Sequence, residues 1–320
     1  DQPFSRTADM LLDKQYYNPD DPRPYDDTGW TLGPLYNAET VRVEDTGILD
    51  AQMTLVSEPV RPAGAVENAQ GARAFIVNYN ADNNLTAFRY AHRNLRIQAA
   101  QSSFDAAGRT FAAGSFITPV AGNGSVAQTL QQAAREYGFT AVGVTDVPNV
   151  PAHDVAAPRV AVLHTWQTTQ TEGWLRLGLD EYGVPYDYIS VHDVRDTPRL
   201  REKYDVILFG PSQNDALSIV AGIQGSEPMP WKKTDVTPNL GSEDSTDDMR
   251  GGLGLEGVLN LQNFVEAGGT LVTLTNSSTL PIHFGMAGNI RELETENLWA
   301  PPGVFRAERT DRGSPLLYGY

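Results

Sequence analysis

The chain has 320 residues, of which 40 % are hydrophobic and 20 % are charged, a composition typical of folded globular proteins. Its 40 acidic and 24 basic side chains give a formal net charge of −16, which repels phosphate backbones and anionic lipid and argues against a nucleic-acid partner. No apolar run approaches the roughly 20 residues of a membrane span. The absence of cysteine excludes disulfides, a thiolate nucleophile and cysteine-ligated metals.

Residues 1–72 are predicted to form an extended, loop-rich segment with one short helix. Prolines and aspartates interrupt most helical patterns in this stretch, and the exception is residues 5–12. There Ser5 is the expected N-cap, and Met10 and Leu11 are expected to face inward. Several aromatic side chains give the segment enough apolar area to dock on a neighbour.

Residues 73–150 alternate strand and helix patterns in an order that indicates a small domain. The expected elements are a strand at 74–79, a helix at 83–95, a hairpin that turns at 105–108, a helix at 125–138 and a strand at 139–145. Gly138 stands where a helix C-terminus favours a left-handed residue. The order strand-helix-strand-strand-helix-strand predicts a small ferredoxin-like α+β domain.

A proline-rich joint at residues 147–158 precedes a second α/β domain, residues 158–320. Its expected elements are strands at 159–164, 186–191, 205–210 and 270–275, and helices at 171–183, 197–204 and 254–269. Regular alternation of strands and helices favours a parallel sheet, so we predict a flavodoxin-like doubly wound domain. The long polar stretch after Gly210 is expected to be functional or mobile.

Polar and aromatic residues gather after the first strand of this second domain, at the edge where doubly wound folds bind ligands. The group consists of His164, Thr165, Trp166, Thr168, Thr169 and Glu172. We take it as the candidate ligand-binding site. The alternative is structural: Glu172 only caps the following helix with Thr171, and Trp166 and Trp174 only pack the domain against its neighbour.

Two further motifs have a binding and a structural interpretation. Gly251, Gly252 and Gly254 precede a helix, where backbone N–H groups bind phosphate, but the same glycines suit a flexible return from the polar stretch. Two acidic clusters offer oxygen ligands for calcium, yet neither has the spacing of an EF-hand, so we expect solvated acidic loops. The clusters are Asp20, Asp21, Asp26 and Asp27, and Glu243, Asp244, Asp247 and Asp248.

Three stretches resemble parts of one protein family. Residues 1–33, DQPFSRTADMLLDKQYYNPDDPRPYDDTGWTLG, resemble a block downstream of the catalytic domain in large bacterial zinc carboxypeptidases of the carboxypeptidase A-like family. Residues 158–186 and 254–274 are similar to the class I glutamine amidotransferase-like module that ends those proteins. The chain starts at Asp1 without a methionine, and residues 316–320 have the pattern of an unfinished strand, so we expect both ends to be cut points of a longer protein.

The resemblance implies a zinc site outside this chain. The peptidase domain of that family holds zinc through a His-x-x-Glu pair and a later His, and uses a Glu as general base. None of the 5 histidines here has Glu three residues after it. They are His92, His153, His164, His192 and His283. We therefore expect no cofactor and no catalytic residue in this chain, with zinc in the absent peptidase domain.

The amidotransferase relatives carry a nucleophilic cysteine on a tight elbow after a central strand, and residues 209–213 here read FGPSQ instead. Ser212 is the nearest hydroxyl, and His283 is the candidate base, but no carboxylate stands at a matching spacing to orient that histidine. The structural alternative is that Pro211 and Ser212 only turn the chain out of the sheet.

These observations lead us to expect a non-catalytic accessory region of a secreted or periplasmic zinc carboxypeptidase-like hydrolase. Its partners would be the peptidase domain, which it positions, or the peptide substrate, which it recognises. One alternative makes the second domain an amidotransferase-like or hydrolase-like enzyme that uses His164 and Ser212. Another makes the region a carbohydrate or cell-wall binding module that uses Trp231 or Trp299.

Overall fold

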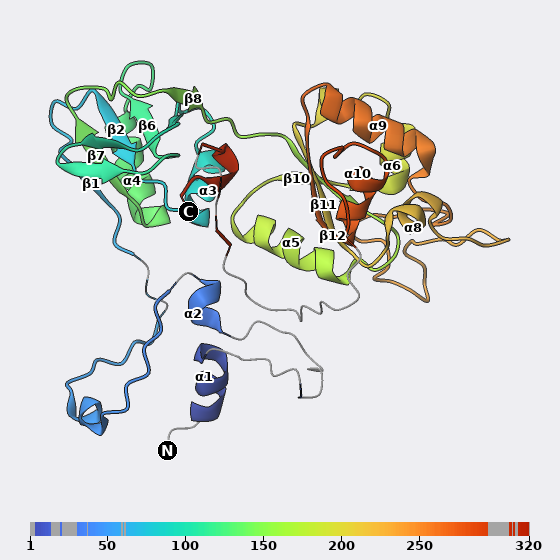
Figure 1. Cartoon of the computed structure of the whole chain (residues 1–320), viewed down its shortest axis with the longest axis horizontal. Coiled ribbons are helices and arrows are strands. Elements are labelled where there is room, and N and C mark those ends of the chain that lie inside the picture. Colours follow the sequence, from blue (N-terminus) through green and yellow to red (C-terminus); the bar gives the residue numbers. More distant parts are fainter. Residues whose placement is uncertain are drawn as a thin grey trace. The chain divides into compact units, whose positions relative to one another are not determined.

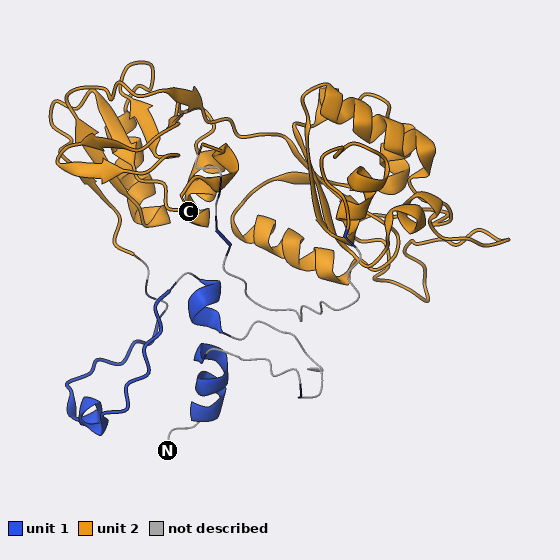
Figure 2. Cartoon of the chain, in the orientation of Figure 1, with its two compact units in different colours: residues 1–60, 293–312 blue, residues 61–292, 313–320 orange. Residues whose placement is uncertain are grey.

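The computed structural model describes residues 4–13, 20, 31–36, 38–58, 60, 62–293, 307–308, 310 and 313–319. The chain forms two compact units (Figure 2). Unit 1 comprises Asp1–Val60 and Leu293–Arg312, and unit 2 comprises Arg61–Glu292 and Gly313–Tyr320. None of the described helices has the length and apolar character that crossing a bilayer requires.

The described residues of unit 1 form helices but no buried core. Its described elements are α1 (Ser5–Leu12), α2 (Leu32–Leu35) and the 3-10 helix η1 (Thr46–Asp50). The bounds of α1 match the predicted helix, but Phe4 is its N-cap instead of Ser5, and Met10 is 46 % exposed instead of facing inward. Gly33 is the only buried residue among those described in this unit. The prediction for Met10 was wrong because the part of unit 1 that the structure describes offers α1 no buried apolar interior to face.

The first part of unit 2 is a 6-stranded mixed sheet with the order β1-β7-β2-β6-β3-β8 (Figure 1). Its strands are β1 (Ala65–Glu67), β2 (Ala74–Val77), β3 (Gln98–Ala100), β6 (Phe116–Pro119), β7 (Thr140–Val144) and β8 (Ala152–Asp154). Neighbouring strands pair antiparallel, except that β1 and β7 are parallel.

Two layers cover this sheet, and the alternation along β2 explains both. Phe75 and Val77 pack with residues of α3 (Asn83–Ala91) and α4 (Val126–Tyr137). Ala74 and Ile76 point to the opposite face, where they pack with the hairpin formed by β4 (Phe104–Ala106) and β5 (Arg109–Phe111). Successive side chains of a strand point to opposite faces, so one apolar strand supplies both cores.

Helix ends in this part follow local chemistry. Gly138 caps α4 in the left-handed region with φ 75°, as predicted. Helix α3 ends earlier than predicted, at Ala91. The guanidinium of the buried Arg89 donates to the carbonyls of His92 and Arg93 at 2.7 and 3.2 Å, which satisfies backbone acceptors that a longer helix would have used internally.

The second part of unit 2 is a 4-stranded parallel sheet with the order β10-β9-β11-β12. Its strands are β9 (Val160–His164), β10 (Tyr186–Ser190), β11 (Val206–Ser212) and β12 (Thr270–Thr275), and its helices are α5 (Gln170–Glu181), α6 (Val191–Asp196), α7 (Leu200–Lys203), α8 (Ala216–Ala221), α9 (Gly254–Glu266) and α10 (Thr279–His283). Together the two sheets confirm the predicted α/β class.

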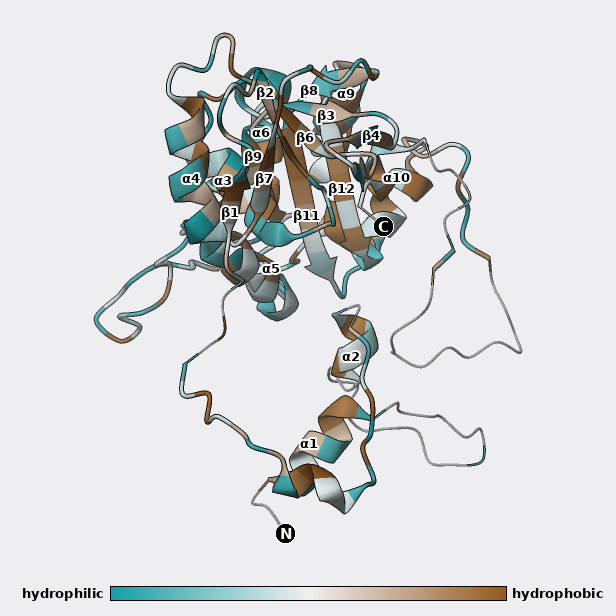
Figure 3. Cartoon of the chain, turned by 90° about the vertical axis from the view of Figure 1, so that its left-hand side faces the viewer, coloured by the Kyte–Doolittle hydropathy of each residue, from teal (hydrophilic) through white to brown (hydrophobic). Residues whose placement is uncertain are grey.

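The core of this second part lies between the sheet and α6, α8, α9 and α10. It contains Leu163, Phe209, Leu261 and Phe264, among others, and Figure 3 shows β11 as largely hydrophobic. Helix α5 packs against β11 and has Glu172 as its only buried residue. The one fully buried side chain of α5 is therefore a carboxylate, whereas its apolar Leu179 is only partly buried against the core.

Residues 313–319 return to the first part of unit 2. They form the 3-10 helix η3 (Pro315–Leu317), so the expected unfinished strand is wrong. Pro315 opens this helix, a position where the missing N–H of proline costs nothing. Tyr318 is buried, and its ring stacks on His153 of β8 with a centroid distance of 6.0 Å.

Candidate functional site

His164 is the last residue of β9, and its side chain is buried at the carboxyl edge of the parallel sheet. Its Nδ1 lies 3.0 Å from the carbonyl oxygen of Thr165, and its Nε2 lies 2.9 Å from Oδ2 of Asp244. A carbonyl and an ionised carboxylate only accept hydrogen bonds, so both bonds form together when both ring nitrogens carry a proton. Asp244 was expected in a solvated loop, but it reaches this edge from 80 residues away in the sequence.

Tyr188 of β10 lies between His164 and an arginine. Its ring stacks on the His164 ring with a centroid distance of 4.1 Å, and the Arg176 guanidinium carbon lies 4.1 Å from the same centroid. Two groups at that distance overlap if they share a face, so they occupy opposite faces of the tyrosine ring. Arg176, on α5, also pairs with Glu243 and donates from Nε to the Tyr186 hydroxyl at 3.3 Å.

Glu172 is the buried acid of the site. It is 3 % exposed, and its Oε2 accepts a hydrogen bond from the Tyr188 hydroxyl at 3.1 Å. Its Oε1 is buried without a hydrogen-bond partner among the described residues. Burial raises the pKa of Glu172 to about 7, against the opposing effects of the Tyr188 hydrogen bond and the Arg176 charge. Burial likewise raises the pKa of Tyr188.

The capping interpretation of Glu172 is wrong. The N-cap of α5 is Thr169, which makes no side-chain capping bond. Glu172 instead turns toward β11, where Gly210 makes room for it, since a Cβ on Gly210 would lie 2.6 Å from the Glu172 Cγ. Trp174, the proposed packing residue of the same helix, is exposed.

Trp166 contacts the His164 ring and is hydrogen-bonded to His192 of α6. Its ring meets the His164 ring edge-on at 5.0 Å, and its Nε1 donates to Nδ1 of His192 at 3.2 Å. Nε2 of His192 lies 3.1 Å from the carbonyl oxygen of Gly251. Because Nδ1 accepts and a carbonyl cannot donate, His192 carries its proton on Nε2. The chain Trp166–His192–Gly251 therefore fixes the indole in place.

A small cavity lies at the carboxyl ends of β9 and β11, where the strand order reverses and doubly wound folds bind ligands. Its lining includes Thr165, Trp166, Asn214, Ser218, Gly222 and Gly251. Its volume is about 10 Å³, which holds about one water molecule. In this conformation the expected ligand position is filled by protein.

The glycines near this cavity allow two backbone segments, around Gly222 and around Gly252, to cross at close range. A Cβ on Gly252 would overlap the carbonyl oxygen of Ile219, and a Cβ on Gly222 would overlap the backbone of Gly251. The N–H of Gly251 donates to the carbonyl of Ile223 at 2.8 Å. This amide is therefore already paired, which counts against the phosphate interpretation, and the tight crossing counts against a flexible hinge.

Ser212 and His283 are not joined as a catalytic pair. Oγ of Ser212 accepts from the N–H of Asn214 at 3.0 Å, and its own N–H donates to Oγ1 of Thr275 at 3.2 Å. His283 is exposed at the end of α10. Within the described part of the chain no hydrogen bond links the two side chains, so the hydroxyl has no base to activate it.

The two other acids of the second acidic cluster each pair with one basic side chain. Asp247 pairs with Lys232, and Asp248 pairs with Arg250 at 2.7 Å. No group of three His, Cys, Asp or Glu residues that suits a metal ion occurs in the described ranges. Residues 21–30, which carry most of the first acidic cluster, and Trp299 lie outside the described residues.

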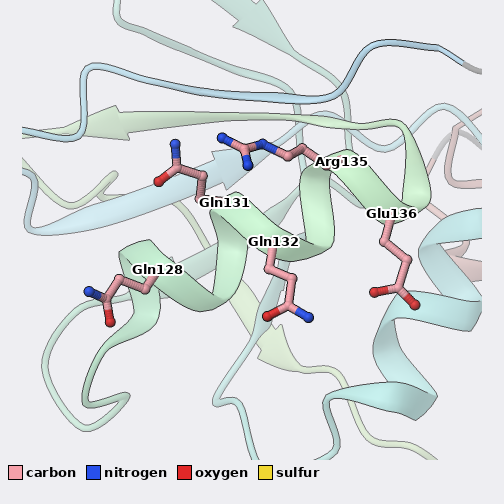
Figure 4. Close-up of a pocket in the computed structure, with 5 residues that line it drawn as sticks. All are labelled: Gln128, Gln131, Gln132, Arg135 and Glu136. Carbon is pink, nitrogen blue, oxygen red and sulfur yellow. The ribbon is translucent and has the colours of Figure 1, made fainter.

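A larger hollow of about 560 Å³ lies along the outer face of α4 (Figure 4). Its lining residues are Gln128, Gln131, Gln132, Arg135 and Glu136. All belong to one helix and are exposed, and in Figure 4 they spread to different sides of it. They do not converge on a common point, so this face lacks the geometry of a binding site.

Sequence reasoning found His164, Thr165, Trp166 and Glu172, and the structure brings them to one edge. It missed Arg176, Tyr188 and Asp244. The spacing of Glu172 and Arg176, four residues apart on one helix, is a local signal that was available. No family model, curated protein or solved structure matches this chain.

Proposed function

We propose that this chain is a non-catalytic accessory region of a zinc carboxypeptidase-like protein, in which it positions the peptidase domain or recognises its peptide substrate. The observation that carries the proposal is the apolar surface of unit 1. A segment whose described residues expose many large hydrophobic side chains and form no buried core is typical of an interaction surface. The resemblance of residues 1–33 to the block downstream of such peptidases supports the identity of the partner.

The apolar surface of unit 1 is concentrated in residues 38–60. Apart from η1, the described residues of this segment form neither helix nor strand, and all of them are exposed. Its exposed large hydrophobic residues are Val41, Val43, Ile48, Leu49, Met53, Leu55, Val56 and Val60. Burying one such side chain contributes about 1.5 to 3 kcal/mol. A partner surface that covers several of them would therefore stabilise the ordered segment substantially.

The site of the parallel sheet supports a non-catalytic role. Its acid, histidine and arginine are paired within the fold, and the neighbouring cavity of about 10 Å³ leaves no space for a substrate. The enzyme alternative would need Ser212 activated by a base, and its hydroxyl accepts a backbone N–H instead. The binding-module alternative retains Trp231, which is partly exposed.

We also propose the finer fold assignments. The order β7-β2-β6-β3, with α3 and α4 on one face, supports a ferredoxin-like domain. The order β10-β9-β11-β12 corresponds to 2-1-3-4 in chain order, which supports a flavodoxin-like, class I glutamine amidotransferase-like domain. In the proposed protein, zinc belongs to the peptidase domain and the location is secreted or periplasmic.

The test is a point substitution in the full-length protein. Leu55 is 90 % exposed in unit 1, and Leu316 is 87 % exposed in unit 2. Leu55→Asp should lower the thermal midpoint or change kcat/KM on peptides with different C-terminal residues, and it should expose residues 38–60 to limited proteolysis. Leu316→Asp is the matched control and should change none of these. If both variants behave as the wild type, docking through residues 38–60 is wrong.

A further inference from the structure

Two basic side chains at the edge of the parallel sheet each contact one of two consecutive acids of one loop. His164 contacts Asp244 at 2.9 Å, and Arg176 contacts Glu243. Both acids belong to the acidic loop, which we define as residues 223–250. This loop leaves the fold after α8 and returns before α9.

The acidic loop is weakly attached to the rest of unit 2. No residue from 221 to 251 is buried. Its base is closed by bridges from Ile223 to Arg250 and Gly251, next to the glycine crossing. Within the loop, Trp231 pairs with Thr246 through both backbone hydrogen bonds. A loop with few buried contacts opens locally at low free energy.

His164 and Arg176, which contact these two acids, are by contrast held rigidly by the fold. The His164 side chain is 3 % exposed and held by the Thr165 carbonyl, and Arg176 is fixed by the Tyr186 hydroxyl and the face of Tyr188. None of these contacts involves the acidic loop. The donors would therefore keep their positions after the loop has left, which is the preorganisation that a binding site needs.

We propose that His164 and Arg176 form a carboxylate-binding site, and that Glu243 and Asp244 occupy it as a built-in competitor for an acidic peptide segment. The chemistry selects carboxylates because the N–H groups of a guanidinium and of an imidazole both donate to them. Two neighbouring acids in the ligand match the two neighbouring acids of the loop. The site lies at the carboxyl edge of the strands, where open α/β sheets bind ligands.

Competition from the acidic loop sets how much the peptide affinity should change when the two loop charges are removed. A ligand that needs the open loop binds with an affinity reduced by the fraction of open molecules. If the loop is closed in about nine of ten molecules or more, removing its two charges should tighten binding at least about 10-fold. The proposal goes beyond the accessory role and does not depend on it.

The test uses the whole chain with Glu243→Gln and Asp244→Asn combined. A fluorescent peptide that contains Glu-Asp between neutral residues should bind this variant at least about 10-fold more tightly than the wild type, measured by anisotropy. The same peptide with Gln-Asn should not bind. Asp247→Asn is the matched control, since Asp247 pairs only within the loop, with Lys232, and should leave the affinity unchanged.

Adding Arg176→Gln to the double variant should abolish binding of the Glu-Asp peptide. A folded double variant that binds no more tightly than the wild type would overturn the proposal. If the double variant does not fold, hydrogen exchange of the wild-type chain gives the same decision. Excess Glu-Asp peptide should speed exchange in residues 229–249, and unchanged exchange would be the overturning result. Because these experiments need no peptidase domain, their failure leaves the docking role of unit 1 standing.

Discussion

Glu172→Gln is expected to change how the stability of the chain depends on pH. The pKa of Glu172 is raised from 4.5 to about 7 in the folded state, chiefly by burial. The folded chain therefore keeps a proton that the unfolded chain releases above pH 4.5. The resulting stabilisation is fully present below the unfolded pKa and is lost as the pH rises through the folded pKa. Between pH 5 and pH 8, the loss through this one group is about 2 to 3 kcal/mol.

The variant removes the titration but adds a constant term. The side-chain oxygen of a glutamine can still accept the hydrogen bond from the Tyr188 hydroxyl. Its amide nitrogen then stands where the unpartnered Oε1 was, or, if the amide is turned the other way, where Oε2 was. An unsatisfied buried donor costs about 1 to 3 kcal/mol at every pH. The difference in unfolding free energy between variant and wild type at a single pH therefore does not test the argument. The change of that difference with pH does.

The assay is urea unfolding of the wild type and the variant at several values between pH 5 and pH 8. Relative to the wild type, Glu172→Gln should gain about 2 to 3 kcal/mol across that range. Glu181→Gln, at an exposed position of the same helix, is the control and should show no such gain. A difference between Glu172→Gln and the wild type that stays constant within about 0.5 kcal/mol would refute the argument from burial.

Three further predictions use the same unfolding or exchange measurements. Tyr188→Phe removes the hydroxyl that lowers the pKa of Glu172, so the pH midpoint of the stability loss should move upward, and an unchanged midpoint would contradict the assigned hydrogen bond. Gly252→Ala should destabilise the chain by about 2 kcal/mol or more through backbone overlap, whereas Gly173→Ala, in open space on α5, should stabilise it by about 0.5 to 1 kcal/mol. Equal effects of the two changes would contradict the glycine crossing. His164→Gln should speed hydrogen exchange in the acidic loop while leaving exchange in the strands unchanged. Loop exchange equal to that of the wild type would show that the contact between His164 and Asp244 does not keep the loop closed.

The parts of the fold that could be predicted are those with long, regular patterns. Strands such as β2 and β11 and helices such as α4 and α9 have continuous apolar or periodic sequences that are visible without tertiary information. Helix α6 was missed because its six residues are too few for a periodic pattern. Its start was nevertheless encoded, since Ser190 and Asp193 form a capping box. Short helices are better predicted from their caps than from their periodicity.

The candidate site was predictable only where its residues are close in sequence. His164 ends one strand, and Trp166 and Glu172 follow it, so their common position at a sheet edge could be inferred. Asp244 could not be inferred, because it is one of several acids in the acidic loop and only the fold brings it to His164. Its local sequence gives no reason to expect a contact with a histidine 80 residues earlier.

The two units differ in what can offset the free-energy cost of ordering their backbones. Ordering the backbone costs about 1 to 2 kcal/mol per residue, which a folded segment offsets mainly by burying apolar side chains. Unit 2 contains buried clusters on its sheets, and it pairs most polar groups of its site internally, with Oε1 of Glu172 as an exception. Among the described residues of unit 1, only Gly33 is buried, so this offset is missing there. If the accessory role is correct, the missing offset comes from the partner surface, and unit 1 should lose its protection from proteolysis first when that surface is removed.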